Sequence, residues 1–140
     1  MVLPYTRVKI TDGFGHRPYL DVILVLGTRS VSTRGLLDTG ADTTLVNKAF
    51  GKHLGVDFKK CRNSYATGID GVTQKTWVAE IVLEVVNLAD SVRQTEVHFI
   101  ESPTVGVLLG HHGFFQNFSV KFDTYMLTFD INHIADAVAK

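Results

Sequence analysis

The feature that most constrains the fold is a succession of short runs rich in β-branched and aromatic residues, separated by glycine, aspartate and asparagine. Such runs are typical of β-strands joined by tight turns. We therefore predict a mostly β protein in which residues 12–15, 27–28 and 87–90 form turns. The predicted strands are residues 5–10, 19–26, 31–37, 77–86, 92–100, 119–123 and 125–131, with 92–100 returning antiparallel to 77–86 and the last two forming a hairpin or a pair of edge strands.

The longest predicted strand alternates between polar and apolar residues. Glu80 and Glu84 share one face, while Ile81, Leu83 and Val85 share the other. Because successive side chains of a strand point to opposite faces, one face of this strand is expected to be exposed to solvent.

Helix is predicted to be scarce. One short helix is expected at residues 47–54, ended by Gly55, and another at residues 111–118. The alanine-rich tail, residues 133–140, is expected either to form a short terminal helix or to fray. The chain has no repeat or linker, so residues 1–140 are predicted to form one domain.

Composition excludes several classes of protein. The 140 residues carry a formal net charge of +0, which does not favour a nucleic-acid partner, and the basic run 59–62 is interpreted as a solvated loop. Cys61 is the only cysteine, so an intrachain disulfide is excluded and a structural thiol is expected. We find neither a signal peptide nor a membrane-spanning run, and we expect a cytoplasmic protein with no membrane partner.

The segment at residues 36–46 reads Leu-Leu-Asp-Thr-Gly-Ala-Asp-Thr-Thr-Leu-Val. The tripeptide Asp38-Thr39-Gly40 is by itself typical of a plain turn. Here apolar residues frame it on both sides, so it is expected to point inward at the end of a buried strand. A carboxylate in that position is costly unless another group shares its proton.

Two further segments add to this pattern. Residues 67–71, Thr-Gly-Ile-Asp-Gly, have the composition of a mobile hairpin tip, although an ordinary turn would look the same. Residues 107–110, Val-Leu-Leu-Gly, form an apolar strand that ends at a glycine before His111 and His112.

With these three segments in this order, the chain resembles the retropepsin-like aspartic proteases, in particular their prokaryotic and archaeal single-domain branch. The resemblance covers roughly residues 19–131 and includes the stretch from Leu109 to Asp123. It implies a closed β-barrel of the acid protease fold, with one or two short helices, and an aspartic endopeptidase that needs no cofactor or metal. Peptides or unfolded protein segments would be its substrates.

The resemblance also implies roles for individual residues. Asp38 would be the catalytic aspartate, Thr39 would hydrogen-bond across a two-fold axis, and Gly40 would let the substrate backbone approach. Gly110 would pack beneath this loop. The implied substrate-binding residues are Ala41 and Asp42, which follow the tripeptide, and the flap tip Gly68, Ile69, Asp70 and Gly71.

One departure from the family pattern concerns the residues after Gly110. The family commonly has an arginine there, which pairs with the acid matching Asp42, followed by Asp or Asn; this chain has His111 and His112. A histidine can hydrogen-bond to a carboxylate, but it lacks the fixed charge and forked geometry of arginine. We therefore expect any contact between His111 and Asp42 to strengthen as the pH falls.

The chain contains a single Asp-Thr-Gly, so a homodimer must supply the second aspartate if Asp38 is catalytic. The six histidines lack zinc-type spacing, and no serine lies in a nucleophile elbow, which disfavours metal and serine chemistry. Two alternatives stay open: a catalytically inactive retropepsin-fold module for dimerisation or peptide binding, and a structural β-barrel. Ile69, Val107 and Leu109 are candidates for apolar pocket walls.

Overall fold

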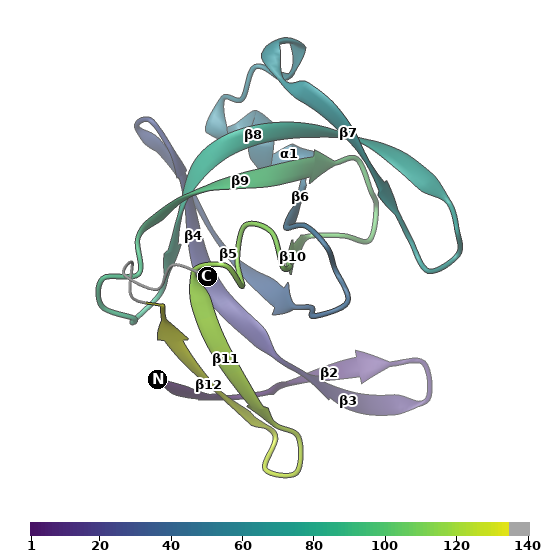
Figure 1. Ribbon diagram of the computed structural model, residues 1–140. Coiled ribbons are helices and arrows are strands. Elements are labelled where there is room, and N and C mark those ends of the chain that lie inside the picture. The colour runs from purple at the N-terminus through teal and green to yellow at the C-terminus, as the bar shows by residue number, and fades with distance from the viewer. Residues whose placement is uncertain (135–140) are drawn as a thin grey trace.

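The computed structural model describes residues 1–134 and consists mainly of strands (Figure 1). Seven strands form the main sheet in the order β4-β5-β10-β6-β9-β8-β7. Because β4 pairs with β8 as well as with β5, the sheet curls back onto itself around the core. Its strands are β4 (Tyr19–Leu26), β5 (Arg29–Leu37), β6 (Leu45–Asn47), β7 (Arg62–Thr67), β8 (Thr73–Val85), β9 (Arg93–Ile100) and β10 (Val107–Leu109).

Two smaller sheets complete the fold. One has the order β1-β12-β11, from Val2–Pro4, Thr128–His133 and Phe118–Asp123. The predicted pairing of the last two strands is confirmed, since β11 and β12 are antiparallel, but residues 125–127, which were predicted as strand, form the turn between them. The helix considered for residues 133–140 lies outside the described residues, except that His133 ends β12.

The other small sheet is a hairpin of β2 (Thr6–Ile10) and β3 (Gly13–Arg17). The prediction that residues 12–15 form a turn is wrong beyond residue 12, because Gly13, Phe14 and Gly15 are paired with β2. Glycine weakens a strand without excluding it, and here cross-strand hydrogen bonds outweigh that propensity.

The predicted helix at residues 47–54 is confirmed as α1 (Lys48–Leu54). The side chain of Asn47 accepts a hydrogen bond from the backbone N–H of Ala49, which caps the first turn. Gly55 ends the helix at φ 82°, the left-handed conformation that glycine adopts without strain. A short 3-10 helix, η1 (Phe58–Lys60), follows it.

The helix predicted at residues 111–118 is wrong, because residues 111–117 form turns and an isolated bridge. Gly113 has φ 97°, which is incompatible with a right-handed helix. Its N–H donates to the side chain of Gln116 at 3.1 Å instead of to a helical carbonyl. The apolar spacing of Phe114 and Phe118 reflects core packing, since both are fully buried.

Strand β8 runs without interruption from the β7–β8 hairpin to its pairing with β4, and Figure 1 shows it curving over the molecule. As predicted, Ile81, Leu83 and Val85 are buried while Glu80 is exposed. Nearer the hairpin the buried side chains are instead those of Thr76 and Val78. The strand therefore changes the face that it buries about midway along its length.

No helix within residues 1–134 is long and apolar enough to cross a membrane.

Candidate active site

Asp38 follows directly after the last residue of β5 and is held there by the backbone. Its N–H donates to the carbonyl of Leu109 on β10, at 3.0 Å, which continues the parallel pairing of β5 with β10. Its carbonyl accepts the N–H of Ala41 at 3.2 Å, which closes a tight turn. The carboxylate therefore stands at the end of a strand in the middle of the main sheet.

The side chain of Asp38 is partly exposed and turns back toward its own loop. Its Oδ1 accepts the backbone N–H of Gly40 at 2.9 Å. A Cβ atom at Gly40 would lie 3.2 Å from the same oxygen, so glycine leaves room for this contact. Among residues 1–134, no hydrogen bond or ion pair is made to Oδ2, which leaves that oxygen available to a ligand or water.

A buried threonine and a glycine support the loop from below. Thr44 Oγ1 donates to the carbonyl of His112 at 3.0 Å and accepts the N–H of Gly110 at 3.2 Å. A Cβ at Gly110 would overlap the carbonyl oxygen of Thr43 and lie 2.7 Å from that of Ala41. The expected packing of Gly110 against this loop is confirmed, and no other residue fits without backbone movement.

His111 contacts the loop at a different place from the one predicted. Its Nε2 lies 2.6 Å from the carbonyl oxygen of Thr39, and its backbone N–H donates to the carbonyl of Ala41 at 2.9 Å. The expected contact with the Asp42 carboxylate is absent among the described residues. The acceptor is a backbone carbonyl in place of the carboxylate.

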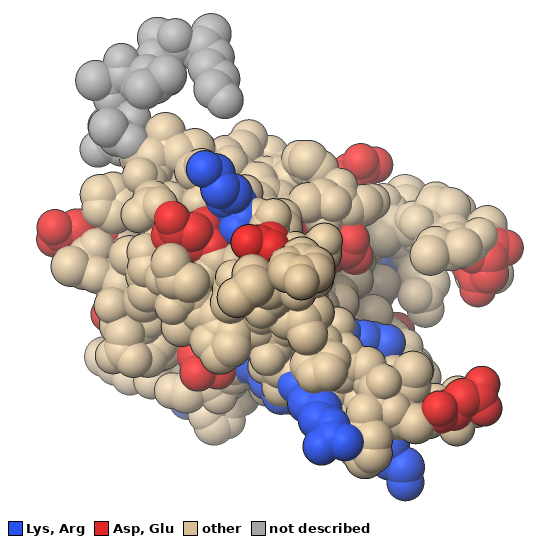
Figure 2. Space-filling model, turned by 90° about the horizontal axis from the view of Figure 1, so that it is seen from below, with Lys and Arg blue, Asp and Glu red and all other residues tan. Residues whose placement is uncertain are grey.

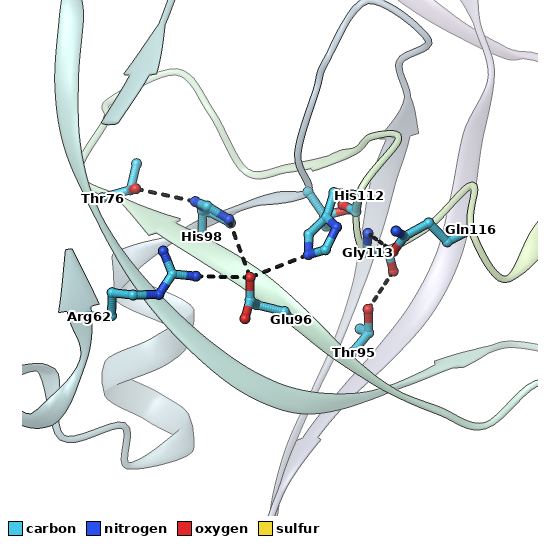
Figure 3. A network of polar contacts seen from close by, with 9 residues as sticks. Arg62, Thr76, Thr95, Glu96, His98, His112, Gly113 and Gln116 are labelled. Carbon is cyan, nitrogen blue, oxygen red and sulfur yellow. Dashed lines mark hydrogen bonds and ion pairs between the residues drawn. The ribbon is translucent and has the colours of Figure 1, made fainter. Parts of the chain in front are cut away.

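His112 points the other way, into a polar network on β9 (Figure 3). Glu96 Oε1 lies 3.3 Å from His112 Nε2 and 3.1 Å from Arg62 Nη2. It also lies 4.0 Å from Nε2 of His98, whose Nδ1 is 3.4 Å from Thr76 Oγ1. The backbone N–H of His112 donates to the carbonyl of Asp42. The network around Glu96 therefore also holds the Asp38 loop at Asp42.

Burial, as the larger effect, lowers the pKa of His98, although the negative charge of Glu96 acts in the opposite direction. The side chain of His98 is 8% exposed, whereas that of Glu96 is 40% exposed. His98 is therefore favoured as the neutral imidazole inside the network, with Arg62 supplying the positive charge next to Glu96.

The hairpin of β7 and β8 carries the other predicted residues at its tip. Asp70 Oδ1 accepts the N–H of Val72, and the N–H of Gly71 donates to the carbonyl of Gly68, both at 3.0 Å. Ile69 is fully exposed. Within the described part of the chain, no hydrogen bond joins this tip to the loop of Asp38. Figure 1 shows the hairpin extending from the body of the molecule.

A cavity of about 330 Å³ opens along β5 and β10, whose last residues lead to the Asp38 loop. Leu36 and its register partner Leu108 line it, and so does Val107, as expected. Leu109 was also expected in a pocket wall, but this is wrong, because its side chain is fully buried in the core. Apart from Val107, none of the lining residues was predicted: Arg17, Tyr19, Thr33, Arg34, Leu36, Thr104, Val105, Gly106 and Leu108.

The environment of Cys61 disfavours the thiolate that a nucleophilic cysteine needs. Partial burial, and then the charge of Asp57, raise the pKa of the Cys61 thiol. Its Sγ contacts the carbonyl of Asp57 at 3.4 Å. This agrees with the structural thiol predicted from the sequence.

Comparisons with known proteins place this geometry in context. The profile of the family described as aspartyl protease matches residues 25–112. The fold is similar to a retropepsin-like aspartic protease from Rickettsia conorii, with a TM-score of 0.60 and 17% identity, over 94% of this chain and 98% of that one. It is also similar to EIAV protease complexed with the inhibitor HBY-793, with a TM-score of 0.53 and 22% identity, over 67% of this chain and 81% of that one. No curated protein matches the sequence.

Proposed function

The chain belongs to the aspartyl protease family and has the retropepsin-like fold expected from its sequence, and we propose that it is a homodimeric aspartic endopeptidase in which Asp38 is the catalytic residue. The observation that carries the proposal is the position of the Asp38 carboxylate. It stands at the end of a central strand, fixed through Oδ1 by Gly40 and open at Oδ2, beside a cavity.

The chemistry requires a second carboxylate. Two carboxylates about 3 Å apart share one proton, because ionising both is costly. The ionised member takes a proton from water as that water attacks the peptide carbonyl, and the protonated member polarises the carbonyl oxygen. Since each chain has one Asp-Thr-Gly, two copies related by a two-fold axis would each supply one Asp38.

The neighbouring residues have supporting roles in this proposal. Thr39 would link the two loops across the axis, while Gly40, Ala41 and Asp42 would bind the substrate main chain. The hairpin tip of residues 68–71 would act as a flap that covers a bound peptide or unfolded segment. Its exposed Ile69 and its glycines suit a segment that closes over a ligand.

Incubation of the purified protein with a peptide library tests the proposal, with and without a statine-type inhibitor. Wild-type protein is expected to cleave peptides and to be inhibited, whereas Asp38→Asn is expected to fold and dimerise without cleaving. Asp21→Asn is a matched control, because Asp21 is an exposed carboxylate on β4 outside the loop. It should cleave as the wild type does.

The outcomes separate the competing functions. Cleavage that survives in Asp38→Asn would refute the catalytic assignment. Peptide binding without cleavage by the wild type would instead favour the inactive dimerisation or peptide-binding module.

A further inference from the structure

We propose that the cavity beside Asp38 receives an acidic side chain of the substrate and that Arg34 determines this preference. The inference rests on the peptidase function proposed above and adds a substrate class to it. Three observations carry it: the position of the cavity, the charges on its wall, and its size.

The cavity lies on the same face of β5 as the Asp38 side chain. Leu36 and Asp38 are two residues apart at the end of this strand, so their side chains project in the same direction. Leu36 lines the cavity, whereas Leu37 between them is 5% exposed and belongs to the core. A substrate residue close to the bond being cleaved would therefore have its side chain at this cavity.

The wall of the cavity carries positive charge without a compensating negative charge. Arg17 and Arg34 are both lining residues, and the lining contains no Asp or Glu. The guanidinium carbon of Arg34 lies 4.3 Å from the ring centroid of Tyr19, another lining residue. Within residues 1–134 neither arginine forms an ion pair, so neither guanidinium group is neutralised by its own chain.

Asp21 is the carboxylate placed to neutralise Arg34, because it lies directly opposite in the β4–β5 register. No ion pair forms between them in the described chain, and Asp21 does not line the cavity. Stacking on Tyr19 keeps the Arg34 guanidinium at the cavity instead. Figure 2 shows most of the visible Lys and Arg side chains near a hollow between two projecting parts of the surface, with acidic side chains on the ends of both parts.

The cavity has room for a glutamate side chain, and the charge of its wall favours one. Its volume of about 330 Å³ is ample for one side chain, so the lining and not the size sets the preference. Leu36 and Leu108 would contact the methylene groups, and a guanidinium would bind the carboxylate through two parallel hydrogen bonds. Because the arginines are exposed to water, we expect a preference of roughly tenfold for Glu over Gln.

An octapeptide library in which each position in turn carries Glu, Gln, Lys or Leu measures this preference as a ratio of kcat/KM values. At one position the wild type should prefer Glu over Gln by roughly tenfold, and Arg34→Gln should abolish the preference. Arg34→Glu should reverse it in favour of Lys. Arg29→Gln, an exposed arginine on β5 outside the cavity, is the matched control and should keep the wild-type ratio.

Binding of the same peptides, labelled with fluorescein, to Asp38→Asn separates this inference from the catalytic one. If no peptide is cleaved but Glu peptides bind more tightly than Gln peptides in an Arg34-dependent way, the catalytic assignment fails and the acidic subsite stands. A Glu-to-Gln ratio near one, or a preference unchanged in Arg34→Gln, would overturn the subsite whether or not cleavage occurs.

Discussion

The Nε2 atom of His111 lies 2.6 Å from the carbonyl oxygen of Thr39, the residue that follows Asp38. The ring also packs against Phe115, with the two ring centroids 5.5 Å apart. A carbonyl only accepts hydrogen bonds, so Nε2 must carry the proton. Nε2 carries a proton in one neutral tautomer as well as in the cation, so either form of the ring can make this contact.

Replacing His111 tests how much this contact contributes to positioning the loop. His111→Phe keeps an aromatic ring next to Phe115 but removes the donor to Thr39, while His111→Gln retains a donor. Loss of one hydrogen bond is worth about 0.5–1.5 kcal/mol. We expect kcat/KM to fall by roughly two- to tenfold in His111→Phe and less in His111→Gln. Equal activity of wild type and His111→Phe would show that the contact does not position Asp38.

The homodimer proposal predicts that activity depends on protein concentration. Because each copy would contribute one Asp38, dissociation should abolish activity in both copies. Activity per chain should therefore fall on dilution from micromolar to low nanomolar protein, together with a fall in mass measured by sedimentation. Constant activity per chain in a protein shown to be monomeric would contradict the proposal.

Gly110→Ala should destabilise the protein because the new methyl group has no space. It would overlap the backbone carbonyl of Thr43, and backbone cannot move as freely as the end of a side chain. We expect a loss of at least about 1–3 kcal/mol in the free energy of unfolding, measured in urea. Gly106→Ala is the matched control, since a Cβ there meets nothing within 4 Å. A similar loss in both variants would contradict this account.

Stability should fall in acid because of His98. Burial lowers the folded-state pKa of His98 below the unfolded value of about 6.5, so the unfolded chain binds more protons between these two values. The stability that the neutral ring provides is complete above about pH 6.5 and is lost as the pH falls through that interval. Urea denaturation over this range should show a smaller pH dependence in His98→Gln than in the wild type.

His53→Gln is the control for this measurement, because His53 is exposed on α1. It should keep the wild-type pH dependence. An unchanged pH dependence in His98→Gln would show that other groups account for the acid sensitivity.

Much of the fold could be predicted because local pattern and tertiary structure agree in the long strands. Residues 19–26 alternate between more and less buried side chains and form β4. Gly55 ends α1 in the left-handed conformation that glycine adopts without strain. The helix at residues 111–118 was wrong because spaced phenylalanines indicate burial without specifying a period. Only the left-handed Gly113 excludes a helix, and a glycine in a sequence does not reveal its φ angle.

The candidate site was predictable in part. The residues around Asp38 are contiguous, so a local pattern was sufficient to find them. The cavity, in contrast, combines Arg34 with residues 104–108, which the pairing of β5 with β10 brings together, and Arg17 lines it from the end of β3. Nothing near Arg34 in the sequence marks it as part of a pocket. Arg34 could be identified as a lining residue only once the pairing of the strands was known.

The uninterrupted course of β8 has a mechanical consequence. One strand of 13 residues extends from the hairpin tip to β4 with no loop between them, and the face that it buries changes midway. The β7–β8 hairpin therefore has no break in β8 that could act as a hinge for rigid-body rotation. Any movement of the hairpin must therefore twist or bend β8, the strand that also pairs with β9 and β4 in the main sheet.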